Sequence, residues 1–264
     1  MSQRQADGAR FLALMKRYCI DYVNVGDQSV TRDLMVEDYL LRMGPHEVRG
    51  RDTAYFDATA RQMQQFPHLM LSVHEIATCG ERLMMRFSEH GCRAKDGRRC
   101  AWGGIGLYRW NGEKLTQCNV EQDYWSRRRQ IASGHADPVD HPAVAPWDED
   151  PQSPDAEAES IVRTSLERGS LWITPGVFCD DAWCGRAPIR VIEHNTVTII
   201  DLFSVGSRVA FHIIQHGRIA TDFTNVPAGT LASLYAAGIV HVADGHVVRG
   251  RVIRNRLDVA VGAQ

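Results

Sequence analysis

Apolar and polar positions alternate with the period of an α-helix in the first part of the chain. Over residues 10–24 the apolar side chains form one stripe, namely Phe11, Leu14, Met15, Tyr18 and Tyr22. This stripe predicts an amphipathic helix. A short helix is predicted over residues 31–41, with Thr31 as its cap. A third is predicted over residues 51–66, because Pro67 ends the helical pattern there.

The period then changes to two, which is typical of strands. We predict strands over residues 69–77 and 82–90 and a long β-hairpin over residues 101–125. The Asn111-Gly112 pair inside the last segment is a strong signal for a hairpin turn. Helices followed by an antiparallel sheet predict an α+β fold for residues 10–130.

The second strand of this hairpin carries an unusual row of polar residues. Alternate side chains share one face of a strand, so the row consists of Gln117, Asn119, Glu121 and Asp123. A strand that only covers a core would not need two carboxylates on one face. We therefore expect this face to line a wet cavity of ligand size.

Residues 134–160 interrupt the pattern of helices and strands. They contain five of the ten prolines and eight acidic residues, without Lys or Arg. This composition predicts a semi-extended, self-repelling linker that is exposed to solvent. The predicted organisation is a first domain at residues 1–133, a linker at 134–158 and a second domain at 159–264.

The second half repeats features of the first half. A helix is predicted over residues 159–168, and short apolar runs follow over 189–192, 197–203, 208–216, 230–241 and 246–258. Residues 79–91 match residues 205–217, and the Asn111-Gly112 turn has a counterpart in Asp244-Gly245. These correspondences predict two copies of one fold, of which the second is truncated and degenerate.

Composition narrows the classes of function. The chain has 264 residues, 44% of them hydrophobic, which is enough for one large domain or two smaller ones. A net charge of −2 gives no general attraction to nucleic acid or to anionic membranes. The start of the chain lacks the apolar core of a secretory signal, and the seven cysteines form no C-x-x-C pair. A cytoplasmic protein with reduced thiols is the expectation.

Several short segments in residues 10–130 have the order and spacing of a known family. They are Glu37-Asp38-Tyr39, Val48-Arg49-Gly50-Arg51, Gln65-Phe66-Pro67-His68-Leu69, Gly80-Glu81-Arg82 and the hairpin from Tyr108 to Gln117. Together with Asp123 they resemble the SnoaL-like polyketide cyclases of the nuclear-transport-factor-two-like (cystatin-like) superfamily. The second half is similar only through the internal repeat.

The resemblance implies a fold and a chemistry. The family fold is a curved sheet around a helix, a cone with a pocket at its mouth. Its enzymes act without metals or cofactors, which implies a cyclase, isomerase or dehydratase acting on a small hydrophobic carbonyl compound. Asp123 matches the family's acid, Glu121 lies one pleat earlier, and Asn119 replaces an aromatic residue. Residues 103–109 contain no histidine, where a cyclase often has an acid–base partner.

Other residues are candidates for ligand contact, each with a plainer explanation. Tyr18, Tyr22 and Trp102 could wall a flat aromatic ligand or simply be core residues. His74, Arg86 and His90 lie on strands that could face the pocket, or could be satisfied elsewhere. The histidines and aspartates at 135, 137, 140 and 141 resemble a metal cluster but lie in the predicted linker, so no metal site is expected.

Two interpretations of function therefore remain open. One is an acid–base enzyme in which Glu121 or Asp123 is the base. The other is a non-catalytic protein of the same fold that binds a small hydrophobic or aromatic molecule or serves in assembly. Counting from the turn glycines, Asn119, Glu121 and Asp123 become Val252, Arg254 and Arg256 in the second copy, so the same chemistry is not expected there. The two sheets are expected to pack face to face as a pseudo-dimer within one chain, with a further homodimer left open.

Overall fold

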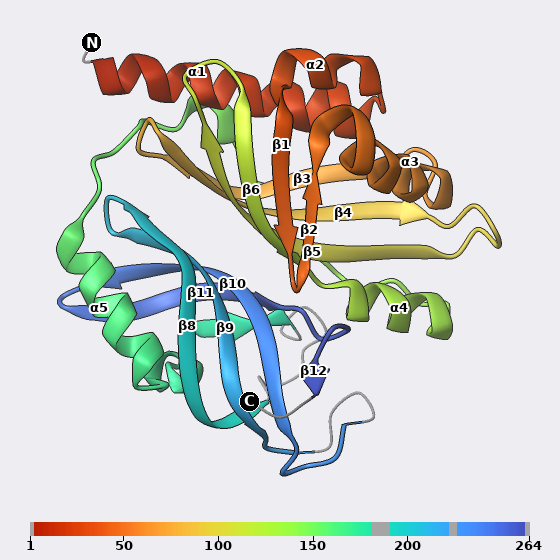
Figure 1. Cartoon of the computed structure of the whole chain (residues 1–264). Helices are drawn as coiled ribbons and strands as arrows, with labels where there is room; N and C mark the ends of the chain where they lie inside the picture. The colour runs from red at the N-terminus through yellow and green to blue at the C-terminus, as the bar shows by residue number, and fades with distance from the viewer. Residues whose placement is uncertain (1–2, 181–190, 222–225, 262–264) are drawn as a thin grey trace.

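Two curved β-sheets, one from each half of the chain, lie against each other with helices on their outer faces (Figure 1). The computed structural model describes residues 3–180, 191–221 and 226–261. The predicted α+β class is confirmed, and each sheet with its helices forms one unit of a tandem. Within the described residues, no helix is long and apolar enough to cross a membrane.

Six strands form the first sheet in the spatial order β2–β1–β6–β5–β4–β3. Neighbours are antiparallel except for β1 and β6, which run parallel. The bounds are β1 Met35–Met43, β2 His46–Arg49, β3 Met70–Thr78, β4 Arg82–Cys92, β5 Arg99–Trp110 and β6 Leu115–Gln122. The predicted hairpin is therefore present as β5 and β6, and Gly112 in its turn has a φ of 96°.

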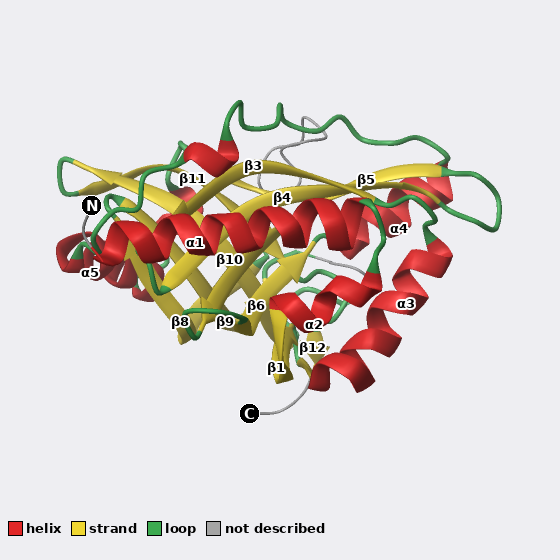
Figure 2. Cartoon of the chain, turned by 90° about the horizontal axis from the view of Figure 1, so that it is seen from above, coloured by secondary structure: helices red, strands yellow, loops and turns green. Residues whose placement is uncertain are grey.

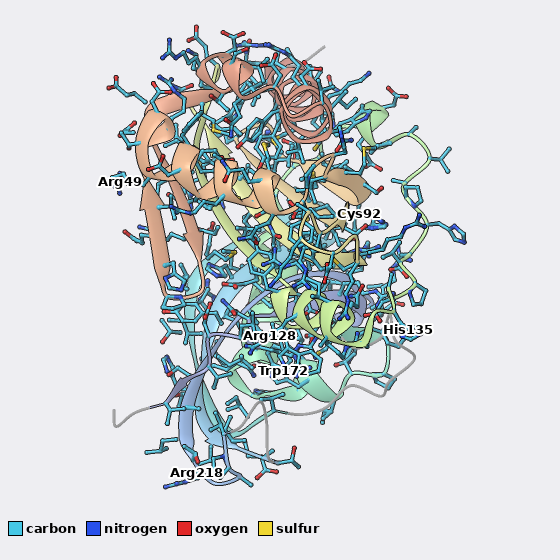
Figure 3. The ribbon with its side chains drawn as sticks, turned by 90° about the vertical axis from the view of Figure 1, so that its right-hand side faces the viewer. Arg49, Cys92, Arg128, His135, Trp172 and Arg218 are labelled. Carbon is cyan, nitrogen blue, oxygen red and sulfur yellow. The ribbon has the colours of Figure 1, made fainter. Side chains whose placement is uncertain are left out.

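Helices cover one face of the first sheet. Helix α1, Gln3–Arg17, continues as a π-helical segment, Tyr18–Asn24, and lies across the strands (Figure 2). Another π-helical segment, Gly50–Tyr55, leads into α3, Phe56–Gln65. These helices match the predictions for residues 10–24 and 51–66. Helix α4, Tyr124–Ser133, follows β6 and lies where the two units meet (Figure 3).

The prediction of a helix over residues 31–41 is wrong. Helix α2 contains only Thr31–Leu34, and the chain then enters strand β1. A short apolar run has no period that separates a strand from a buried helix. Pairing decides the outcome here, because β1 hydrogen-bonds to β2 on one side and to β6 on the other.

The second sheet has the spatial order β7–β11–β10–β9–β8, and β12 pairs with β10. Its outer face is covered by helix α5, Ala156–Glu167, whose Val162 and Leu166 are fully buried. The strand bounds are β7 Val177–Cys179, β8 Ile192–Val205, β9 Arg208–Ile219, β10 Leu231–Ala243, β11 His246–Arg254 and β12 Ala260–Val261. The short elements η2, η4 and η5 are Gln28–Val30, Pro146–Asp148 and Ser170–Ile173.

The two units share one strand order. Strands β6–β5–β4–β3 of the first sheet correspond to β11–β10–β9–β8 of the second, and β7 runs parallel to β11 as β1 does to β6. Among the described residues, the second unit has no counterpart of β2 or α3. The sequence Gly185-Arg186-Ala187 echoes Gly50-Arg51-Asp52 at the start of the third predicted helix, and it lies outside the described residues together with Cys184.

Strand register corrects the residue correspondence drawn from the turn glycines. Gly106 lies opposite Val120 in the first sheet, and Gly238 lies opposite Val252 in the second. The count is therefore wrong by one residue, which in a strand moves every side chain to the other face. By register, Asn119, Glu121 and Asp123 correspond to Arg251, Ile253 and Asn255.

The inner faces of the two sheets pack on each other. A buried apolar cluster combines residues of both units, namely Ala77, Cys79, Met84, Ile105, Leu107, Phe203, Val205, Ala210, Ala237, Ile239 and Ile253. Two ion pairs at equivalent positions flank this cluster: Glu75 with His241 at 2.9 Å, and Asp201 with Arg109 at 3.3 Å. In the first pair the acidic residue belongs to the first unit and the basic residue to the second. In the other pair the acidic residue belongs to the second unit and the basic residue to the first. The contact is thus built around an approximate two-fold axis.

The acidic segment between the units is docked, whereas the sequence predicts a solvated linker. The backbone N–H of Ala143 donates to the carbonyl of Val73 on the edge strand β3, at 2.8 Å. The carboxylate of Asp140 accepts from Arg86 of the first unit at 2.9 Å and from Arg251 of the second at 2.8 Å. Arginines of the two units thus offset the negative charge of Asp140, which composition alone did not reveal.

We expect Ile239→Ala to destabilise the whole chain, because Ile239 is fully buried between the sheets. The free energy of unfolding should fall by about 2–5 kcal/mol in a urea titration, the usual cost of truncating a buried Ile. Val248→Ala is the matched control, since Val248 is 46% exposed and should change stability by less than about 0.5 kcal/mol. Equal effects of the two substitutions would contradict a shared core.

Candidate functional site

A cavity of about 210 Å³ lies within the first unit, between its helices and the outer face of its sheet. Helix α3 and the β1–β2 hairpin both contribute side chains that remain partly exposed, including Met63 and Met43. Five tyrosines contribute most of the aromatic lining: Tyr18, Tyr22, Tyr55, Tyr108 and Tyr124. The cavity is therefore apolar in its walls but has many hydroxyl groups.

The tyrosines at positions 18 and 22 line the cavity. Their spacing along the π-helical segment places both side chains on the sheet-facing side, and their ring centroids are 5.5 Å apart. Burial raises the pKa of Tyr22, so its hydroxyl keeps its proton. That hydroxyl is buried, and no neighbouring group meets it in good hydrogen-bond geometry.

Glu89 is the one acidic residue among the described residues that line the cavity. It belongs to β4, where Leu83, Met85 and Phe87 precede it in the same row of alternate side chains. The Nε2 atom of Gln62 on α3 donates to its carboxylate at 2.7 Å. The hydroxyl of Tyr124 donates to the Oε1 atom of Gln62 at 3.2 Å, which completes a short hydrogen-bonded chain.

The environment of Glu89 favours its protonated form up to neutral pH. Burial raises the pKa of this carboxyl to about 7, against the opposing effects of the Arg127 charge and of the hydrogen bond from Gln62. The guanidinium of Arg127 lies 4.0 Å from the ring centroid of Tyr124 and 4.9 Å from that of Trp102. A carboxyl poised in this way can both take up and release a proton near neutral pH.

Glu121, a carboxylate predicted to be catalytic, lies on the other face of the sheet. Strand β6 presents Cys118, Val120 and Gln122 to the cavity, so Glu121 points towards the second unit. Its Oε1 atom is 2.7 Å from the Nε2 atom of His212 and accepts from the backbone N–H of Gly44 at 2.8 Å. The expectation that this row lines a wet cavity is wrong, because the row is buried against the second sheet.

Asp123, the other predicted catalytic carboxylate, caps helix α4. Its carboxylate accepts from the backbone N–H of Ser126 at 3.1 Å. The guanidinium of Arg256 donates to both of its oxygens, at 2.8 and 2.7 Å. Both charged side chains are at most 2% exposed. A catalytic role for Asp123 or Glu121 stays a prediction, and this placement does not support it.

The other residues predicted to bind a ligand divide between the two faces. Trp102 is fully buried outside the cavity lining, and its indole N–H donates to Gln122, which does line the cavity, at 2.8 Å. Asn119 donates to Asp201 of the second unit at 3.0 Å. Trp102 can therefore affect the cavity through Gln122 and through Glu89, whose pKa it helps to lower.

The prediction that His74, Arg86 and His90 could face the cavity is wrong. Alternation along β4 places Arg86, Ser88 and His90 on the face opposite Glu89. The hydroxyl of Ser88 lies 2.7 Å from Nε2 of His74 and 2.7 Å from Nε2 of His90. Burial lowers the pKa of both histidines. This cluster lies under the docked segment, whose His141 carbonyl is 3.0 Å from Nδ1 of His74.

Sequence reasoning missed Glu89 and Gln62 as well as three of the five tyrosines. The available signal for Glu89 was its place at the end of an otherwise apolar row on β4. In the described part of the chain, no group of three or more His, Cys, Asp or Glu side chains could hold a metal ion. The six cysteines that the structure describes are free thiols.

The first unit is similar to known proteins. Residues 16–118 match the family model of the SnoaL-like domain. A structure assigned as a SnoaL-like polyketide cyclase from Jannaschia sp. CCS1 is 13% identical, with a TM-score of 0.46, and the match covers 50% of this chain and 99% of that chain. No curated protein sequence matches.

Two further solved structures also match about half of this chain. TsrD from Streptomyces laurentii is 21% identical, with a TM-score of 0.42, and the match covers 47% of this chain and 96% of TsrD. A LEH-like epoxide hydrolase from M. tuberculosis is 12% identical, with a TM-score of 0.41, over 48% of this chain and 89% of the hydrolase. Each match thus spans about half of the present chain.

The raised pKa of Glu89 predicts a pH dependence of stability. The folded chain holds the Glu89 proton up to about pH 7, whereas the unfolded chain releases it near the ordinary value of 4.5. The free energy of unfolding should therefore decrease as pH rises through this interval and level off above it. Glu89→Gln lacks this ionisation. Its stability relative to the unmodified chain should rise by roughly 3 kcal/mol between about pH 4.5 and about pH 8.

Urea titrations at a series of pH values measure this difference. Glu113→Gln is the matched control, because Glu113 is exposed in the β5–β6 turn and its removal should leave the curve parallel to that of the unmodified chain. Parallel curves for Glu89→Gln would show that the Glu89 carboxyl titrates as it does in water.

Proposed function

We propose that this protein, whose residues 16–118 form a SnoaL-like domain, is an acid–base catalyst acting on a small carbonyl compound bound in the cavity of the first unit. One observation carries the proposal. A buried carboxyl, Glu89, with a pKa of about 7 faces a cavity of ligand size together with a group of tyrosine hydroxyls. A base whose pKa lies near the operating pH combines a populated reactive form with a useful driving force for proton transfer.

In the proposed reaction, the Glu89 carboxylate removes a proton from the carbon next to the substrate carbonyl. The electron pair of the broken C–H bond moves into the carbonyl group, which becomes an enolate. The Tyr22 hydroxyl donates a hydrogen bond to the enolate oxygen and stabilises its charge in a site of low dielectric constant. Glu89 then returns its proton to another carbon in an isomerisation. In a cyclisation, the enolate carbon attacks a second carbonyl of the same molecule, the π electrons of that carbonyl move to its oxygen, and Glu89 returns its proton to this alkoxide oxygen.

Gln62 acts as a positioning residue in this proposal. Its amide N–H holds one oxygen of Glu89 at 2.7 Å, and its carbonyl oxygen accepts from Tyr124. The hydrogen bond from Gln62 fixes the orientation of the carboxylate that transfers the proton. The Arg127 charge nearby limits how far burial raises the pKa of the carboxyl.

The second unit has a supporting role in the proposal. It covers the inner face of the first sheet, where Glu121 and Asp123 would otherwise be exposed to water. We propose that it takes the place of a partner subunit within the chain. The cavity lies on the far side of the first sheet from the second unit, so this contact does not cover it.

Proton exchange tests the proposed chemistry without the natural substrate. The probe is β-tetralone, a neutral two-ring ketone with acidic protons next to its carbonyl, incubated with the full chain in heavy water. We expect catalysed deuterium incorporation, followed by NMR, with a rate that rises through about pH 7 as Glu89 ionises. Glu89→Gln should lower that rate by about 10²-fold or more.

Glu121→Gln and Asp123→Asn serve as the comparison, because they remove the two carboxylates that the sequence favours. Each variant needs a thermal unfolding curve, since both carboxylates are buried against polar side chains of the second unit. Loss of exchange in a folded Glu121→Gln or Asp123→Asn variant, but not in Glu89→Gln, would overturn the assignment of Glu89. If β-tetralone binds tightly but no proton exchange occurs, the protein binds the ketone without catalysis, and the proposed enzymatic function is wrong.

A further inference from the structure

The size of the cavity limits the size of its occupant. A protein cavity of about 150 Å³ holds benzene, and pockets for drug-sized ligands begin at about 300 Å³. The cavity of about 210 Å³ lies between these values. It therefore suits a molecule of one or two rings, and it is too small for a compound of four fused rings.

The charge of the lining limits the charge of the occupant. Among the described residues that line the cavity, none is Lys, Arg or His, so a bound anion would find no counter-charge there. A bound anion would also lie near Glu89. A cation would lie near the guanidinium of Arg127, which stacks on the Tyr124 ring just outside the lining, and its one counter-charge in the lining, Glu89, stays protonated up to about pH 7. A neutral molecule avoids both costs.

The hydrogen-bonding groups of the lining limit the polarity of the occupant. The Tyr22 hydroxyl is buried without a partner in good geometry, next to the hydroxyls of Tyr55 and Thr59. The Thr59 hydroxyl already donates to the backbone carbonyl of Tyr55 at 3.0 Å. A buried donor without an acceptor is costly, and an acceptor oxygen on a ligand would remove that cost. Neither neighbouring hydroxyl meets Tyr22 in good geometry, so the Tyr22 proton has no well-placed acceptor in the cavity.

We infer that the occupant of the cavity is a neutral compound of one or two rings whose carbonyl oxygen accepts a hydrogen bond from Tyr22, and that Tyr22 is a specificity-determining residue. This inference rests on the proposed function and names its substrate class. The Tyr22 hydroxyl favours a ligand with an acceptor oxygen, and the cavity walls favour a ligand whose remaining part is small and apolar. The inference concerns binding, so it can be tested without turnover.

Calorimetric titration of the full chain with β-tetralone tests the role of Tyr22. We expect Tyr22→Phe to weaken binding about five- to tenfold, the usual effect of losing one hydrogen bond to a ligand. Tyr39→Phe is the matched control. The Tyr39 hydroxyl is also buried without a partner in good geometry, but Tyr39 does not line the cavity. Thermal unfolding should show both variants folded.

A series of probes tests size and charge. Naphthoate is an anion and aminotetralin a cation of similar size, and tetracenequinone is a neutral compound of four fused rings. We expect each to bind at least about tenfold more weakly than β-tetralone. Equal or tighter binding of any of the three would overturn the inference, as would equal affinity of Tyr22→Phe and Tyr39→Phe for β-tetralone.

The two proposals can fail separately. If β-tetralone binds through Tyr22 but no proton exchange depends on Glu89, the proposed catalysis fails and the ligand class stands. If Glu89 catalyses exchange while Tyr22→Phe binds β-tetralone as the unmodified chain does, the ligand class fails and the catalysis stands.

Discussion

The alternation of side chains across the first sheet determines where chemistry can occur in this protein. Both faces of that sheet are covered, one by helices and one by the second sheet. On β6, Glu121 turns to the second unit and Gln122 turns to the cavity. Polar side chains on the covered inner face need hydrogen-bonding partners there, and Glu121 has His212 of the other unit. The cavity described above lies over the outer face, so the candidate site is built from that row.

The sequence was sufficient for most of the elements, residues 31–41 excepted, but not for the choice of face. The helical stripe correctly brought Tyr18 and Tyr22 to the sheet, and the Asn111-Gly112 pair correctly placed the hairpin. The two rows of β6 differ in polarity, but polarity does not say which covering layer each row meets. Arg256, which binds Asp123, and His212, which contacts Glu121, come from the second half of the chain, far away in sequence. Local pattern cannot reveal such partners.

Glu89 is the opposite case, a residue of the candidate site that the sequence pattern did not indicate. A single carboxyl at the end of the apolar row of β4 resembles an exposed strand end, and the row's apolar start gives no sign of a cavity. The cavity arises only when α3, the tyrosines of the π-helical segment and the β1–β2 hairpin meet over that row. The segment Met35–Met43 was read as a helix, and without that strand the sheet lacks the hairpin that lines one side of the cavity. The cavity could therefore not be predicted from the sequence, because a segment that forms one of its walls was predicted as a helix and is a strand.

The covalent link between the units also changes how the interface can evolve. A symmetric homodimer makes every contact twice, so one substitution alters two places at once. In this chain the contact of Glu121 with His212 is made once, because its mirror positions hold Ile253 and Arg86. Arg86 binds Asp140 of the connecting segment instead. Each half can thus accumulate changes that the other does not have to share, which allows one unit to retain a cavity while the other becomes its permanent support.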